Sequence, residues 1–314
     1  MKSFEELYNE FQNNQGIINA AQEAKIATRK RNKIFWSIFL TINLILIIFI
    51  LLKAKDSDII ILVAPFIFFT DFFVLILSFI IISVAFPNKK LSEYKKLFKE
   101  QIIKGLISNF FDDVKYFPEQ EMTEEEYDDG EYKEYYNRYW ADDYIKAKID
   151  GKYDITMAEV LTEHETTDSD GDTHTETVFH GIYSKIKIDK SINSDLRIST
   201  NYQRGYSNRL EMDSSEFEKK FEVYASDKII GMQILTADIM EELLNFKNKV
   251  KYYFDIFIKK NTIYIRFHCG AMFEAKTMKK DKLDEKSIKI YYDVLEFINE
   301  FINRLIKIIN EVEI

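Results

Sequence analysis

Residues 34–52 read IFWSIFLTINLILIIFILL, and residues 59–86 read IIILVAPFIFFTDFFVLILSFIIISVAF. A helix that crosses a bilayer core of roughly 30 Å needs about 20 mostly apolar residues. The first run has that length and no charge, and the second is longer and carries one carboxylate, Asp71. These runs predict a two-helix transmembrane hairpin with a large soluble domain behind it.

Basic residues flank the predicted hairpin on both sides, whereas the connection 53–58 holds two Lys and two Asp. Short flanks rich in Lys and Arg stay on the cytoplasmic side of a membrane. Heavy use of Ile, Lys, Asn and Phe is typical of an AT-rich bacterial genome. We therefore expect a multi-pass protein of a bacterial cell membrane, with the lipid bilayer as a partner and both termini cytoplasmic. The net charge of -9 over 314 residues argues against nucleic-acid binding.

Asp71 is the one acidic residue within the two runs. A carboxylate at the centre of a bilayer costs roughly 2.5–3.5 kcal/mol, so it should face a polar partner. Thr41 or Asn43 of the first run could supply that partner, as could Asp71 of a second protomer. One interpretation is a polar contact that holds the hairpin or an oligomer together. The other is an ion or proton path.

The rest of the chain divides by composition. Residues 1–33 place apolar side chains at helical spacing and predict an amphipathic helix. Residues 87–143 predict a helix followed by an acidic, tyrosine-rich segment, and residues 144–314 predict a cytoplasmic α+β domain. The charge of the acidic segment indicates solvated surface, and its aromatic residues indicate that one side packs. A protein-binding role for this segment would use Tyr132, Tyr136 and Trp140.

Strand patterns come first in the soluble domain and helices later, which favours an α+β fold with a mainly antiparallel sheet. Asp170-Gly171, between the strand patterns 156–167 and 173–188, predicts a hairpin. A two-residue turn would place Glu165 opposite Glu176, and opposed like charges are destabilising. Either the register differs by one residue or a basic partner binds these two candidate binding residues.

Further elements follow from the same reasoning. Strands are expected at 196–200, 219–225 and 229–235, and a helix at 236–248. A second hairpin is expected from 252–258 and 262–269. The apolar positions of 285–312 recur every three or four residues and predict a long C-terminal helix.

The chain offers little catalytic chemistry. It has no glycine-rich phosphate loop and no Gly-x-Ser-x-Gly elbow. Cys269 and His268 are neighbours in a strand pattern and should point to opposite faces. Asp142 and Asp143 precede a strand pattern and indicate a turn, although an acidic hydrolase site there is a third hypothesis. The sequence therefore predicts no enzyme.

The hairpin tip with Asp168, Asp170 and Asp172 has the look of a calcium loop, but it lacks the later bidentate Glu. In the two-residue-turn register His164 and His174 lie on opposite faces. His180 is about 20 Å from His174 along the strand, too far to share one metal ion. We therefore predict no metal site and no cofactor.

Three groups of residues carry a family resemblance. They are Asp142-Asp143-Tyr144-Ile145, Phe179-His180-Gly181-Ile182-Tyr183, and above all Phe217–Asp227 with Gln233-Ile234-Leu235-Thr236. In these the chain resembles the DUF3137 family, bacterial membrane proteins of unassigned function, over about residues 91–275 and the two apolar runs. The resemblance implies a fold group and no activity.

The predicted function is accordingly a membrane-anchored binding or scaffold module. It would hold an α+β domain at the inner membrane face and engage a protein partner or self-associate. The alternative is a small membrane oligomer with a polar path at Asp71.

Overall fold

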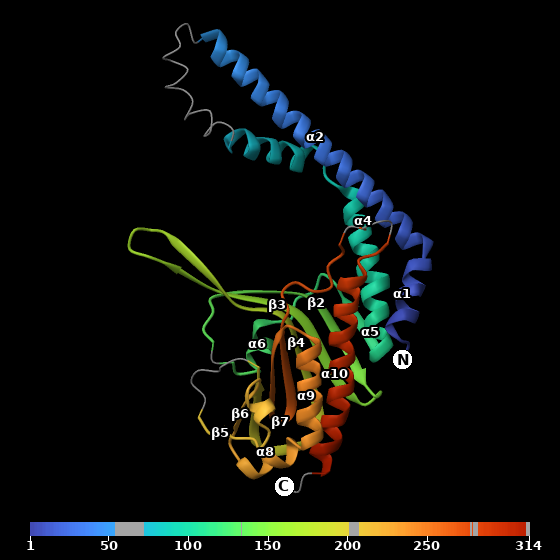
Figure 1. Ribbon diagram of the computed structural model, residues 1–314, viewed down its shortest axis with the longest axis vertical. Coiled ribbons are helices and arrows are strands. Elements are labelled where there is room, and N and C mark those ends of the chain that lie inside the picture. The colour runs from blue at the N-terminus through green and yellow to red at the C-terminus, as the bar shows by residue number, and fades with distance from the viewer. Residues whose placement is uncertain (54–71, 133, 201–206, 277, 279–281, 312–314) are drawn as a thin grey trace. The chain divides into compact units, whose positions relative to one another are not determined.

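The computed structural model describes residues 1–53, 72–132, 134–200, 207–276, 278 and 282–311 (Figure 1). The chain forms two compact units. Residues 1–7, 99–274 and 286–314 make up the first, here the sheet unit, and residues 8–98 and 275–285 the second, here the helical unit.

Exposed apolar helices dominate the helical unit. α1 (Phe4–Asn13) is followed by α2 (Gln15–Lys53), a second helix covers Phe72–Ala85, and α4 spans Lys89–Leu97. Large apolar side chains in the second half of α2 and in Phe72–Ala85 are exposed: Trp36 is 53% exposed, Phe49 58% and Phe73 68%. Such a surface is unfavourable in water and suits a lipid environment.

Within the described residues, α2 over Gln15–Phe49 is the single helix long and apolar enough to cross a membrane. A second crossing would require Phe72–Ala85 and the helical run Lys89–Phe110, bent by 67°, to count as one span. The predicted second run, 59–86, is described only from residue 72. Asp71 and the connection 53–58 lie outside the described residues, apart from Lys53 at the end of α2.

The sheet unit is an α+β fold, and its seven described strands form one antiparallel sheet. The strands are β1 (Asp112–Phe117), β2 (Arg138–Ile149), β3 (Tyr153–Thr167), β4 (Thr173–Ser199), β5 (Arg209–Leu210), β6 (Glu222–Ala225) and β7 (Tyr253–His268). Its helices are η1 (Phe98–Ile103), a π-helix entering the unit, α5 (Lys104–Phe110), α6 (Glu124–Asp128), α7 (Ser215–Glu218), α8 (Lys228–Ile234), α9 (Ala237–Lys249) and α10 (Glu285–Glu311).

The long strand β4 organises this sheet. Its first half pairs with β3, its last residues pair with β6, and β7 runs along it from Ile182↔Phe267 to Ser199↔Asp255. Gly181 permits the close approach of β7, because a Cβ there would lie 1.8 Å from the carbonyl oxygen of Phe267 at a φ of +156°. Just beyond the end of β7, the Gly270 amide donates to the carbonyl of His180, the residue before Gly181.

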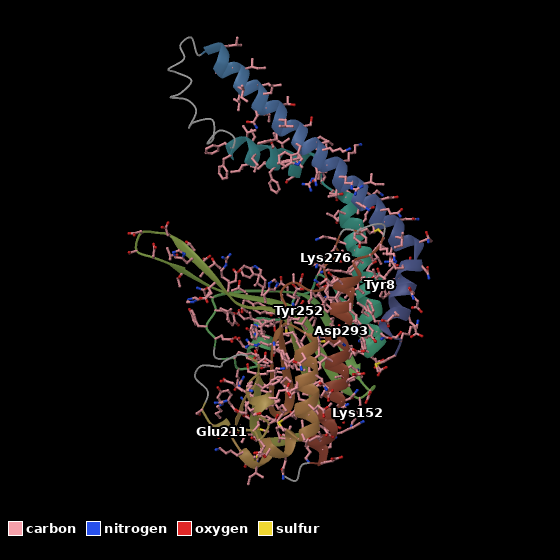
Figure 2. The ribbon with its side chains drawn as sticks, in the orientation of Figure 1. Tyr8, Lys152, Glu211, Tyr252, Lys276 and Asp293 are labelled. Carbon is pink, nitrogen blue, oxygen red and sulfur yellow. The ribbon has the colours of Figure 1, made fainter. Side chains whose placement is uncertain are left out.

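Different layers cover the two faces of the sheet. Phe246 of α9 and Phe297 of α10 stack on each other at 3.6 Å and contact Phe254 and Phe267 of β7. Asp293, labelled in Figure 2 on α10, forms ion pairs with Lys249 at 3.0 Å and Lys289 at 2.8 Å. The other face packs under α6 and the tyrosines of the acidic segment, a core of Met122, Tyr127, Ala141, Tyr144, Ala158, Val160, Phe179, Tyr183, Phe257 and Tyr264.

Several sequence predictions are confirmed, among them the first hairpin, the helix at 236–248 and the long C-terminal helix. The strand predicted at 229–235 is wrong, because Asp227 accepts from the amides of Ile229 and Ile230 and starts helix α8. The strand predicted at 219–225 is shorter, Glu222–Ala225, and follows the short helix α7.

The second predicted hairpin is also wrong. Residues 253–268 form the single strand β7, which pairs with β4 from Asp255 to Phe267. The polar residues Lys259-Lys260-Asn261 mark a register irregularity instead of a turn, and Lys260 has a φ of +52°.

The first hairpin differs from its predicted register by one residue. Its turn is Asp168–Asp172, closed by Thr167↔Thr173, so Glu165 faces Thr175 and Glu176 faces His164. Asp168 explains the longer turn, since its carboxylate accepts from the amides of Asp170 (3.0 Å) and Asp172 (2.9 Å). This shift also overturns the prediction that His164 and His174 lie on opposite faces: they occupy diagonal positions on one face.

Candidate functional site

Lys99 and four acidic side chains lie close together in the sheet unit. The central ones are Asp142 and Asp143 of β2 and Glu159 of β3, and one carboxylate oxygen from each lies within 4.8 Å of the others. Glu274, beyond β7, completes the acidic set, since its Oε1 is 3.4 Å from the Lys99 ammonium. We call these five residues the Lys99 cluster.

A β-bulge explains how adjacent residues reach the same site. In a regular strand Asp142 and Asp143 would point to opposite faces. The β2–β3 register instead shifts between Asp142 and Ile145, and Asp143 has a φ of +53°. The extra residue in β2 redirects the Asp143 side chain, as bulges do beside functional sites. The turn predicted at Asp142-Asp143 is therefore wrong, because both residues lie inside β2.

Lys99, on the π-helix η1, supplies the positive charge. Its ammonium lies 2.7 Å from Asp143 Oδ2 and 3.9 Å from Asp142 Oδ2. Tyr116 of β1 donates to the other oxygen of Asp143, which is fully buried. Three converging carboxylates could hold a hard cation, and the lysine ammonium pairs with two of them, Asp142 and Asp143.

Two acids of the cluster, Glu159 and Asp143, have raised pKa values. Burial, together with repulsion from Asp142, Asp143 and Glu274, raises the pKa of Glu159 to about 8, although the Met272 amide donates to it at 2.8 Å. Burial raises the pKa of Asp143 to about 6, against the opposing effect of Lys99.

His180 of β4 lies at the edge of the cluster. Its Nε2 is 3.4 Å from Glu159 Oε1, and burial lowers its pKa. Glu159, Asp143 and His180 thus all have pKa values moved in the direction that reduces charge near neutral pH. The Lys99 cluster can take up or release protons there, which is the range of general acids and bases.

A second cluster lies on the face that the acidic segment covers. Arg266 of β7 is fully buried and donates to Asp255 Oδ2 (2.9 Å) and to Glu134 Oε1 (3.1 Å). Asp255 also contacts His268 Nε2 (3.0 Å) and accepts from Ser199 Oγ (2.5 Å). Although burial opposes it, Arg266 and then His268 hold the pKa of Asp255 well below its usual range. We call these residues the Arg266 cluster.

The predicted site residues are divided between the core and the surface. Tyr132 stacks on Arg266, with the guanidinium carbon 3.5 Å from the ring centre. Tyr136 is half-buried and donates to Asp128 (2.6 Å). The acidic segment therefore uses these two tyrosines mainly to cover the sheet, and sequence reasoning had no signal for Arg266 as the residue beneath them.

The other predicted contacts gather at the surface. Trp140 is 41% exposed, with the guanidinium of Arg138 4.8 Å from its ring centre. Arg138 Nη1 lies 2.5 Å from Glu165 Oε2, so both alternatives for Glu165, a shifted register and a basic partner, are realised. Glu176 is exposed near the hairpin tip.

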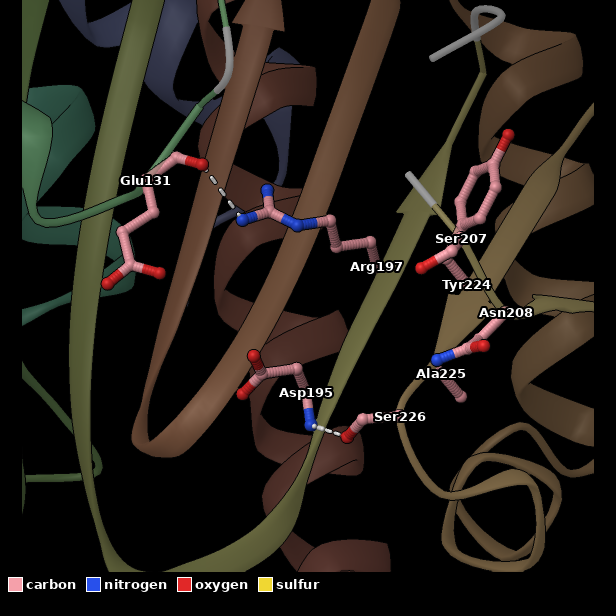
Figure 3. A pocket seen from close by; sticks show the side chains of 8 residues that line it. All are labelled: Glu131, Asp195, Arg197, Ser207, Asn208, Tyr224, Ala225 and Ser226. Carbon is pink, nitrogen blue, oxygen red and sulfur yellow. Dashed lines mark hydrogen bonds between the residues drawn. The ribbon is translucent and has the colours of Figure 1, made fainter. Parts of the chain in front are cut away.

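A polar hollow of about 350 Å³ lies beside β4 and β6 in the sheet unit (Figure 3). Arg197 points toward it from β4, and its Nη2 donates to the backbone oxygen of Glu131 at 3.0 Å. Also on β4, the Asp195 amide donates to Ser226 Oγ at 2.8 Å. These polar groups already form hydrogen bonds within the protein, so the hollow offers few groups for binding a ligand.

Comparison with known families gives the same assignment as the sequence motifs. Residues 177–307 match the family described as Protein of unknown function (DUF3137). This match supports the family resemblance over that part of the chain. The matched region runs from within β4 into the last turns of α10, so Asp142–Ile145, one of the quoted motifs, lies outside it.

Other comparisons are sparse. No curated protein matches the chain. Among solved structures, the crystal structure of the mycobacterial trehalose monomycolate transport factor A, TtfA, is similar with a TM-score of 0.39 and 8% identity. The matched region covers 68% of this chain and 97% of the TtfA chain.

Proposed function

We propose that this protein is a non-enzymatic, membrane-anchored scaffold whose sheet unit binds a protein partner. The anchor is α2, joined in this proposal by the second apolar run, with both termini and the sheet unit on the cytoplasmic side of a bacterial membrane. The support for the anchor is the run of exposed apolar side chains from Trp36 to Phe49. The basic flanks support the orientation.

The observation that carries the partner-binding part is the β3–β4 arm, residues 164–176. Beyond Arg138↔Glu163 and Ile182↔Phe267, β3 and β4 pair with no other described strand, and they extend away from the sheet (Figure 1). A two-stranded ribbon is only marginally stable by itself and offers two open edges. Such an arm is best suited to contact another molecule.

Exposed aromatic and charged residues surround the base of this arm. Tyr135 is 70% exposed and lies 5.0 Å from the ring of His164. Trp140 and Arg138 form the cation–π pair described above, and Asn137 bonds the backbone of Glu165 in both directions at 2.8 Å. Trp, Tyr and Arg are the residues that most often dominate protein–protein binding energy. We propose this base as the centre of the interface.

The test is site-specific photo-crosslinking of the full chain in native membranes. A photoreactive residue at Thr175 on the arm should give a discrete cross-linked product, and one at the exposed Glu211 should not. Trp140→Ala should reduce the Thr175 product at least tenfold, since truncating such an anchor typically costs about 2 kcal/mol of binding free energy. Glu211→Ala is the matched surface control.

Two outcomes would contradict the proposal. One is a Thr175 product whose yield is the same with Trp140→Ala and Glu211→Ala. The other is the absence of any Thr175 product while the chain remains in the membrane fraction and its circular dichroism is unchanged.

A further inference from the structure

A hollow of about 510 Å³ lies in the helical unit where α2 passes the turn into α4. It is lined from α2 by Lys30, Arg31 and Ile34, and from the turn by Phe86 and Lys89. This volume is within the roughly 300–1,000 Å³ range of small-molecule sites. Asn88 fixes the turn, because its amide donates to Thr28 Oγ1 of α2 (2.8 Å) and its oxygen caps α4 at the Leu91 amide (3.1 Å).

The walls of this hollow carry an excess of positive charge. Lys90 is neutralised by Glu23 (2.9 Å) and Glu93 (3.1 Å). Among the described residues, no carboxylate pairs with Lys30, Arg31 or Lys89. The N-terminus of α4, which begins at Lys89, adds its positive dipole end on the same side. The chemistry favours an anion.

Arg31 provides an independent sign of a missing partner. Its Nε is buried and has no hydrogen-bond acceptor among the described residues. A buried guanidinium N–H without an acceptor is costly. Phosphate and carboxylate oxygens match the planar donors of arginine better than any other common groups do.

The remaining lining is apolar and leads into the exposed apolar surface. Ile34 begins the first apolar run of α2, and the exposed Phe86 ends the second. A ligand for this site would therefore combine an anionic head with an apolar tail. A soluble phosphate would satisfy Arg31 but would leave the apolar wall uncovered.

We propose that this hollow binds the phosphate headgroup of an anionic phospholipid, with Arg31 and Lys89 on the phosphate and Phe86 against the acyl chains. Basic pockets beside membrane helices bind such headgroups. The inference rests on the membrane anchoring of the proposed function and adds a specific lipid site to it.

The experiment counts lipids on the full chain released from nanodiscs into native mass spectrometry. The nanodiscs contain phosphatidylcholine with a minor fraction of phosphatidylglycerol. The unmodified chain should retain phosphatidylglycerol in preference to phosphatidylcholine, and Arg31→Gln should lower that retention at least fivefold. Arg31→Lys should lower it nearly as much, because it keeps the charge and loses the planar donors.

The matched controls are Arg29→Gln and Arg29→Lys. Arg29 is exposed, lies outside the hollow and is two residues from Arg31, on the opposite side of α2. Retention should be unchanged in both. Equal losses from Arg29→Gln and Arg31→Gln, or full retention by Arg31→Lys, would show a diffuse surface charge and overturn the proposal.

A second arm separates lipid from free phosphate. In phosphatidylcholine nanodiscs, titration with inorganic phosphate or glycerol 1-phosphate should give no saturable binding at concentrations where phosphatidylglycerol is retained. Saturable binding equal to that of the lipid would also overturn the proposal. A chain that does not enter nanodiscs at all contradicts the anchor itself, whereas one that enters but retains no phosphatidylglycerol contradicts only the lipid site.

Discussion

The Arg266 cluster and the Lys99 cluster place the same kinds of side chain in one sheet with opposite electrostatic results. Asp255 is nearly buried but has a guanidinium, an imidazole and a hydroxyl within hydrogen-bond distance, and its pKa is lowered. Glu159 is also buried but lies among Asp142, Asp143 and Glu274, with no cation paired to it among the described residues except the weakly placed His180, and its pKa is raised to about 8. The number of cations and donors per carboxylate decides the direction, whereas burial is common to both.

The two clusters should therefore respond to pH in opposite ways. The pKa of Asp255 is lower in the folded chain than in the unfolded one, so its stabilisation is present above the unfolded value of 3.8 and is lost as the pH falls through the folded value. The pKa of Glu159 rises from 4.5 to about 8 on folding. Between these values the folded state binds more protons than the unfolded state, so stability falls as the pH rises.

The largest effect should come from Arg266→Met. This change leaves the buried Asp255 and the partly exposed Glu134 without their shared cation, and breaking a buried ion pair typically costs about 3–5 kcal/mol. The measurement is the free energy of unfolding in guanidinium chloride at pH 7, followed by circular dichroism of the full chain in detergent.

The companion variant Arg266→Met with Asp255→Asn should regain part of the loss, because it removes one uncompensated charge. A loss below about 1 kcal/mol for Arg266→Met alone would mean that the cluster is not a buried, saturated ion pair.

Glu159→Gln should instead stabilise the folded chain at high pH. At pH 9 the unmodified chain must bury an ionised carboxylate at this position, whereas the glutamine of the variant stays neutral. Since one pKa unit corresponds to about 1.4 kcal/mol, the variant should be more stable by roughly 2–4 kcal/mol at pH 9. At pH 4 the gain should vanish, because Glu159 is then protonated in the folded chain.

Unfolding free energies of both proteins from pH 4 to pH 9 test this prediction. Glu176→Gln is the matched control, as it removes the same charge from an exposed position on the hairpin arm. An equal gain in both variants would reflect net charge alone and would contradict the prediction.

These contrasts also show what the sequence could reveal. The Asp-Gly turn, the β alternation and the apolar stripe of α10 are local patterns, and each predicted its element. Helix α8 was missed because Ile229, Ile230 and Ile234 suit a strand, and only the cap at Asp227 distinguishes the helix.

The Lys99 cluster depends on long-range contacts. In the sequence Lys99 is one of the basic residues after the apolar runs, and nothing near it indicates that it meets Asp142, Asp143 and Glu274. The bulge in β2 likewise arises from pairing with β3, since Asp142-Asp143 alone is equally compatible with a turn. Arg266, in a strand of alternating apolar residues, gave no sign of its acidic partners.

Lys99→Met should destabilise the chain less than Arg266→Met, by about 2 kcal/mol at pH 9, because Asp142 and Glu274 are partly exposed to water. The loss should shrink as the pH falls through about 6, where Asp143 becomes protonated and no longer needs the ammonium. Unfolding free energies at pH 5 and pH 9 measure the difference. A loss that is constant over this range would indicate that Lys99 acts through packing of its methylene groups.

The smallest effect should come from Asp142→Asn. Asp142 faces Glu159 directly across the β2–β3 ladder, and its side chain is half-exposed, so solvent screens its repulsion. The variant should gain less than about 1 kcal/mol at pH 9. Its more informative signature is the pH dependence: removing one neighbouring charge should lower the pKa of Glu159 and move the fall in stability to lower pH. An unchanged pH dependence of stability would mean that burial alone sets the pKa of Glu159. The two clusters would then differ in their cations and not in repulsion between neighbouring carboxylates.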